Sequence, residues 1–76
     1  MSRKLQYVYI ADCEVVDSTA AAIKVLIDTS PVWIPKSQLH DHCDLWIVGD
    51  IGDLIIPDWL ATSKDIEPDG EYETDD

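Results

Sequence analysis

Apolar residues near the start of the chain recur at alternate positions, which is the spacing of β-strands. Residues 5–16 carry β-forming side chains on both faces and indicate a strand that is covered at least partly on each side. Residues 22–27 place Ile23, Val25 and Ile27 on one face and a lysine on the other. The β-branched residues in this segment favour a strand over a helix. The pattern therefore predicts two strands in the first part of the chain.

A turn follows the second predicted strand at residues 28–31, where Asp and Ser can bond to local backbone and a proline fixes its own φ. Residues 32–34 then form a short return strand, which makes a hairpin with residues 22–27. Pro35 cannot donate a ladder hydrogen bond, so the end of this strand lies at an edge or a bend. The polar residues 37–44 are expected to form a loop, with room for one helical turn.

A second hairpin is predicted further along the chain. Residues 45–48 are apolar on both faces, so we expect a strand in which Trp46 is buried. Residues 49–53 contain two glycines and are expected to form a turn, and residues 54–56 form the next strand. Pro57 favours the first turn of a short helical segment, because its missing N–H would have no partner there.

These elements predict one small, mainly β domain. A chain of 76 residues buries a thin core, and five short strands at this size are expected to curl into an OB-like or SH3-like barrel, with a half-open roll as the alternative. One short helical turn ends the domain, which we place at residues 1–66. Residues 67–76 contain acids, Pro and Gly almost alone, so they are expected to form a disordered acidic tail.

The charge of the chain limits the classes of molecule that it is expected to bind. Sixteen acids against five bases give a formal net charge of -11, and seven of the acids lie in residues 65–76. Such a surface repels phosphates, because nucleic-acid affinity comes largely from Lys and Arg. We therefore expect no direct nucleic-acid binding and favour a basic protein partner.

The composition also indicates the cellular compartment in which the protein is expected to work. No apolar run approaches the ~20 residues that a membrane span needs, and the basic N-terminus lacks the apolar region of a signal peptide. Cys13 and Cys43 are fewer than the disulfide framework of a secreted mini-domain, so two free, buried thiols are expected. We expect a cytoplasmic protein without a membrane partner.

Candidate metal chemistry centres on the polar loop. His40, His42 and Cys43 lie together, and Cys13 comes from an earlier strand. Zinc modules pair Cys-x₂₋₄-Cys or His-x₃₋₅-His, and neither spacing occurs here. We expect no metal at these residues, and a solvated loop with one inward cysteine instead.

Catalysis finds little support in the residues. Ser37 lies near His40, but the chain has no nucleophile elbow and is too small to shape a deep pocket beside its core. It also has no Gly-rich phosphate loop. We expect neither enzymatic activity nor a cofactor.

Binding candidates come from tryptophans and from carboxylates on rigid backbone. Trp33 lies opposite the inward face of its strand and beside Lys36, which makes it the best candidate for an exposed anchor. Acids around the glycine turn and the helix start would have their spacing fixed by the backbone. The predicted binding residues are Asp50, Asp53, Asp58, Trp33 and Lys36.

Two phrases resemble a small domain found in phage and prophage proteins. They are VWIPKSQLHD at residues 32–41 and GDLIIPDWLA at residues 52–61. In that domain a strand ending in V-W-[IF]-P-K-S-Q is followed by an acidic loop, a hydrophobic strand and I-P-x-W-[LA]. The resemblance covers roughly residues 20–66 and implies a phage setting and a compact β fold, without catalytic residues. The HDHCD loop and the long acidic tail depart from it.

Charge, size and this resemblance together predict a non-enzymatic inhibitor. Such a protein would bind a host nucleic-acid-handling defence protein and compete with nucleic acid, as anti-CRISPR and anti-restriction proteins do. The alternative is an accessory interaction module of phage replication or recombination machinery. A plain single-strand binder needs a basic groove with aromatics, for which five bases are too few. The sequence predicts neither the identity of the partner nor the oligomeric state.

Overall fold

The longest strand organises the structure, a computed structural model that describes residues 6–72. This strand, β1 (Tyr7–Ser18), pairs antiparallel with β2, β4 and β5. The elements follow one another as β1, β2 (Ala22–Ile27), β3 (Ser30–Pro35), η1 (Lys36–Gln38), β4 (Ile51–Pro57), α1 (Asp58–Ser63) and β5 (Gly70–Tyr72). Residues 6–72 therefore form a small, mainly β domain with five antiparallel strands and one short α-helix, as the sequence predicts at this level.

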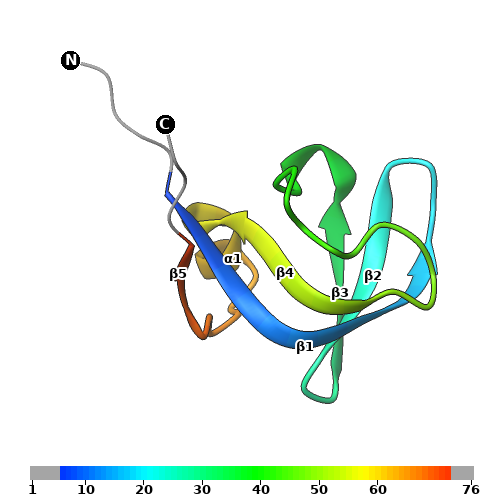
Figure 1. Ribbon diagram of the computed structural model, residues 1–76, viewed down its shortest axis with the longest axis horizontal. Helices are drawn as coiled ribbons and strands as arrows, with labels where there is room; N and C mark the ends of the chain where they lie inside the picture. Colours follow the sequence, from blue (N-terminus) through cyan, green and yellow to red (C-terminus); the bar gives the residue numbers. More distant parts are fainter. Residues whose placement is uncertain (1–5, 73–76) are drawn as a thin grey trace.

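The strand order is β3-β2-β1-β4, with β5 on β1. Strand β4 pairs with β1 from Tyr7 to Glu14. Strand β5 pairs with the first residues of β1, and β2 pairs with the last residues of β1. Asp12 has φ 59, and the pairing with β4 shifts register between Ile10 and Cys13, so β1 bends there. Figure 1 shows the bent β1 beside β4, with the β2–β3 hairpin near one end and β5 near the other.

The sheet is not closed by these pairings. In the part of the chain that the structure describes, β3 and β4 stand at the two ends of the strand order and are not paired with each other. The curvature of β1 folds the sheet over its own apolar face, but the barrel expected from the sequence is not established by the strand pairing.

The core lies on the inner face of this curved sheet. Alternate residues of β1 point into it, as the period of two requires, and they meet side chains from the hairpin, from β4 and from α1. Burying one large aliphatic side chain contributes ~1.5–3 kcal/mol, so the larger members dominate the stability of so small a domain. The largest fully buried aliphatic side chains are Ile23, Ile34, Leu45, Leu54, Ile56, Val15 and Val25.

Several predicted elements are confirmed. The strand at residues 22–27 and its hairpin with the return strand are present, although β3 is longer than expected. The helix begins directly after Pro57 and buries Leu60 and Ala61. One turn of 3-10 helix opens the predicted loop after Pro35.

The predicted strand at residues 45–48 is wrong, because these residues form a loop. The carboxylate of Asp50 accepts hydrogen bonds from the backbone N–H groups of Trp46 and Ile47, at 2.9 and 3.0 Å. A local side chain thus satisfies the donors that a neighbouring strand would otherwise take. Trp46, expected to be buried, is 38% exposed, while Leu45 is fully buried.

The acidic tail also differs from the expectation. Residues 70–72 form β5 instead of a disordered segment, and residues 73–76 lie outside the described part. Asp69 anchors this end of the chain: its backbone N–H donates to Tyr9 O, and its carboxylate accepts from Ala11 N at 2.7 Å. Gly70 then leaves room for the Tyr9 ring, since a Cβ there would lie 2.9 Å from Tyr9 Cε1. Residues 70–72 thus pair with the first residues of β1.

Candidate interaction surfaces

Apolar side chains gather on the surface where the loop before β4 meets the second half of β1. We call Val16, Trp46, Ile47, Val48 and Ile51 the apolar tip. Ile47, Val48 and Ile51 are 66, 56 and 69% exposed. Neighbouring exposed apolar residues of this size are characteristic of sites that bind another molecule.

The backbone of the apolar tip is held in one conformation. Asp50 N–H donates to Ile47 O at 3.0 Å and closes a turn, in which Gly49 adopts φ 100. Only glycine enters this left-handed region freely. Val15 then fixes the turn to β1, because its N–H donates to Asp50 O and its carbonyl accepts from Gly49 N. The loop therefore lies alongside the second half of β1.

Inward residues of the same loop complete this anchoring. Leu45 and Cys43 are buried in the core, and the indole N–H of Trp46 donates to Cys43 O at 2.7 Å. This hydrogen bond fixes the orientation of the Trp46 ring while more than a third of the residue remains accessible. The apolar tip is thus pre-organised, which lowers the entropy lost when a partner binds.

Carboxylates border the apolar tip. Glu14 is the cross-strand partner of Ile51, Asp17 follows Val16, and Asp44 N–H donates to Asp53 O beside the loop. The acid rim consists of Glu14, Asp17, Asp44, Asp50 and Asp53. Hydrogen bonds from the backbone N–H groups of Ile47 and Trp46 lower the pKa of Asp50 below its ordinary value. This carboxylate therefore stays ionised and contributes negative charge beside the tip.

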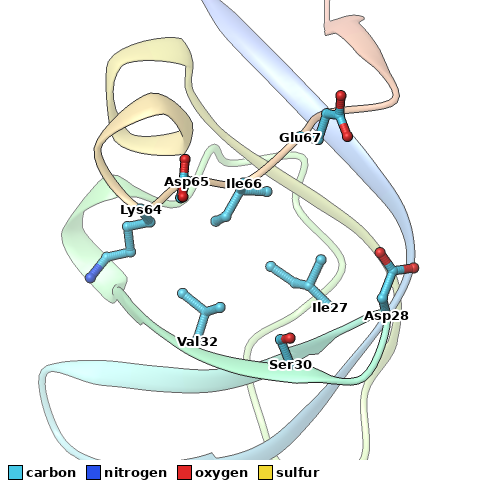
Figure 2. A pocket seen from close by; sticks show the side chains of 8 residues that line it. All are labelled: Ile27, Asp28, Ser30, Val32, Lys64, Asp65, Ile66 and Glu67. Atoms are coloured by element: carbon cyan, nitrogen blue, oxygen red, sulfur yellow. The ribbon is translucent and has the colours of Figure 1, made fainter.

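A hollow lies on another side of the molecule, between the β2–β3 hairpin and the segment after α1. Its volume is about 370 Å³. Figure 2 shows Ile27, Val32 and Ile66 pointing toward its centre. The remaining lining residues are polar or charged and surround this apolar floor: Asp28, Ser30, Lys64, Asp65 and Glu67.

A second hollow of about 320 Å³ adjoins the first, and the two share Ile27, Asp28 and Glu67. It adds the β1 bend to the lining through Ile10, Ala11 and Asp12, and it adds Asp69 from the segment before β5. Three aspartates around the two hollows, Asp12, Asp28 and Asp65, have φ of 59, 57 and 62. Aspartate tolerates this conformation better than most residues, and it retains a carboxylate where glycine would have none.

The binding residues predicted from sequence do not gather at one site, although Asp50 and Asp53 both belong to the acid rim. Asp50 precedes β4, Asp53 lies within it, and Asp58 begins α1, so the last two stand about 15 Å apart along the strand direction. Trp33 is 39% exposed on β3, with Lys24 Nζ 5.8 Å from its ring centroid. Lys36 lies in η1.

Sequence reasoning did not identify the two hollows. It placed Trp46, Ile47 and Val48 in a strand with Trp46 buried, whereas Val16 was assigned to the first strand and Ile51 to a turn. The combination of Gly49 and Asp50 was the one signal for the exposed loop, since Asp caps local turns. No sequence pattern joins residues 27–32 to residues 64–69.

Among residues 6–72, the buried titratable groups are the thiols of Cys13 and Cys43. Burial raises the pKa of Cys13 to about 12, and it also raises the pKa of Cys43. Both cysteines are free and buried, as predicted, so neither is a reactive nucleophile at neutral pH. Within residues 6–72, no three His, Cys, Asp or Glu side chains are arranged to hold a metal ion.

No protein-family model, curated protein or solved structure matches the chain. Among the described residues, none of the helices has the length and apolar character needed to cross a membrane.

Proposed function

We propose that the protein is a non-enzymatic inhibitor that docks on a basic, nucleic-acid-handling protein and competes with nucleic acid for it. The observation that carries this proposal is the apolar tip inside its acid rim. Protein interfaces combine a well-packed apolar centre with a polar border, and a few large side chains supply most of the binding energy. Trp46, Ile47 and Ile51 supply such a centre here.

The acid rim determines the kind of partner. Residues 6–72 contain thirteen acids and three lysines, so most of these carboxylates have no lysine within this range to pair with. Opposite charge on the partner speeds encounter and orients it, whereas acidic or phosphate surfaces are repelled. A groove of Lys and Arg that normally holds phosphates meets this requirement. Its occupation by the protein would exclude nucleic acid.

The setting of this activity is part of the proposal. The phrases VWIPKSQ and IPDWLA resemble a phage domain, and a phage protein with this surface would act in the cytoplasm of its host on a defence protein. Anti-CRISPR and anti-restriction proteins are the nearest functional analogy.

The test has two stages. The full chain first captures partners from a bacterial lysate, with and without nuclease, at salt concentrations of about 0.05 and 0.5 M. We expect a nuclease-resistant, salt-sensitive complex. The purified partner is then titrated with its nucleic acid in the presence of the protein, and each should displace the other. Simultaneous binding without a salt effect would show that the proposal is wrong.

A further inference from the structure

We propose that the hollow between the β2–β3 hairpin and the segment after α1 receives a Lys or Arg side chain of a protein partner, together with an adjacent apolar side chain. This inference rests on the proposed function, because it gives the basic partner a second contact away from the apolar tip. It adds a site, an occupant and a set of residues that the tip does not include.

The floor of the hollow is apolar. Ile27 and Val32 are half-buried at the edge of the core, and Ile66 is buried. Figure 2 shows their side chains converging from β2, β3 and the segment after α1. A floor of this kind favours the aliphatic stem of a long basic side chain and a neighbouring apolar residue, both of which lose water on entry.

The rim of the hollow is negative on the side where the two hollows join. Asp28 and Glu67 are exposed, border both hollows, and lie on the same side of the floor in Figure 2. Asp12 and Asp69 continue the negative rim along the bend of β1. The stem of a bound side chain would therefore lie on the isoleucines, with its cationic end between Asp28 and Glu67.

Lys64 does not fill this position. Its side chain lies on the opposite border of the hollow and extends away from the floor in Figure 2. The charge around the hollow also selects among occupants. A phosphate or a carboxylate would meet like charge at Asp28, Asp65 and Glu67, and so would a second copy of this acidic chain.

The experiment uses the full chain with labelled methyl groups and a blocked pentapeptide that carries two arginines around one isoleucine. Binding is followed by NMR at about 0.05 M salt. We expect saturable shifts at the methyl groups of Ile27, Val32 and Ile66, and none at Ile47 or Val48. A peptide with serine in place of isoleucine should bind more weakly, and spermidine should not shift the three floor methyls to saturation.

Matched variants separate a site from general attraction between opposite charges. Asp28→Asn and Glu67→Gln should each weaken the peptide by ~2- to 5-fold, the range for exposed ion pairs. Asp41→Asn and Glu71→Gln remove the same charge from positions outside both hollows and should leave the affinity unchanged. Each variant is first checked for a wild-type methyl spectrum elsewhere in the molecule.

Three results would overturn the inference: shifts spread over the whole surface, equal weakening by all four variants, or equal saturable binding of spermidine at the floor. Its failure is distinguishable from failure of the proposed function. If the peptide does not bind in the hollow while partner capture still depends on the apolar tip, the hollow proposal is wrong and the proposed function is unaffected. If the peptide binds in the hollow but the protein does not compete with nucleic acid, the hollow proposal is supported and the inhibitor proposal is wrong.

Discussion

The ring nitrogen Nδ1 of His42 lies 2.6 Å from Tyr72 Oη, which joins the loop after η1 to the last described strand, thirty residues away. His40 packs edge-on against the rings of Tyr7, His42 and Tyr72, with ring centroids 4.7, 5.1 and 5.0 Å away. The two histidines considered as metal ligands therefore hold β5 against β1.

The first prediction tests this contact. Tyr72→Phe removes the hydroxyl and keeps the ring, so the free energy of unfolding should fall by ~0.5–1.5 kcal/mol. Backbone amides of β5 should also exchange faster with solvent. Tyr7→Phe is the control, because its ring remains against His40. Unchanged exchange in Tyr72→Phe would show that the hydroxyl does not hold β5.

The second prediction compares two neighbours in the loop before β4. Leu45 is fully buried, so Leu45→Ala should cost ~2–5 kcal/mol of stability. Trp46 is partly exposed, so Trp46→Ala should cost less, ~1–3 kcal/mol, through its hydrogen bond to Cys43 O and the covered part of its ring. Urea unfolding of both variants measures the difference. A larger loss in Trp46→Ala would place that ring in the core.

Two segments, residues 22–27 and residues 45–48, show why part of the fold is predictable from the sequence and part is not. Ile23 and Val25 stand on either side of Lys24, so a period of two predicts the inward face of β2, and both residues are fully buried. The run at residues 45–48 is apolar on every side, and its period does not separate a buried strand from an exposed loop. Only the hydrogen bonds from Trp46 and Ile47 to Asp50 decide between them.

Long-range contacts explain the remaining differences. The composition after Ile66 indicates disorder. In the structure, however, the Asp69 carboxylate accepts a hydrogen bond from Ala11 N at the β1 bend, and Gly70 leaves space for the Tyr9 ring. These partners are about sixty residues away along the chain, for example 58 for the Asp69 hydrogen bond, so no local pattern reports them. The hollow floored by Ile27 and Ile66 depends on the same long-range approach.

The third prediction concerns acid. The pKa of Asp50 is lowered because its carboxylate accepts hydrogen bonds from the backbone of Ile47 and Trp46. A lowered pKa in the folded state means that the stabilisation is present above the ordinary value of 3.8 and is lost as pH falls through the folded pKa. A carboxyl NMR titration should place the midpoint below 3.8, and the amides of Trp46 and Ile47 should shift with it. In Asp50→Asn that amide titration should disappear.

The fourth prediction concerns alkali. The buried thiol of Cys13 has a pKa raised from 9.0 to about 12, so the unfolded chain releases this proton first as pH rises. Stability from this group is present below 9.0 and falls between about 9 and 12, by up to ~4 kcal/mol at the upper end. Cys13→Ala should therefore show a shallower loss of stability over that range. An equal slope would mean that another group governs alkaline unfolding.

The last prediction tests the apolar tip as the interface of the proposed inhibitor. Ile47→Ser with Val48→Ser removes two exposed apolar side chains but leaves the Asp50 turn and the buried Leu45 in place. Stability should therefore change by less than ~0.5 kcal/mol, as for other surface substitutions. Partner affinity should fall by at least ~30-fold, because losing a hot-spot contact costs ~2 kcal/mol or more.

Trp59→Ala is the matched control for this prediction, since Trp59 is 52% exposed on α1 and belongs to neither the apolar tip nor the hollows. It removes more apolar surface than either serine substitution, yet partner affinity should remain that of the wild type. Affinities are measured by titrating the purified partner at fixed salt. Equal weakening by Trp59→Ala would indicate non-specific apolar adhesion. Full affinity in the double-serine variant would place the interface elsewhere, and Trp33 on β3 would then be the next position to substitute.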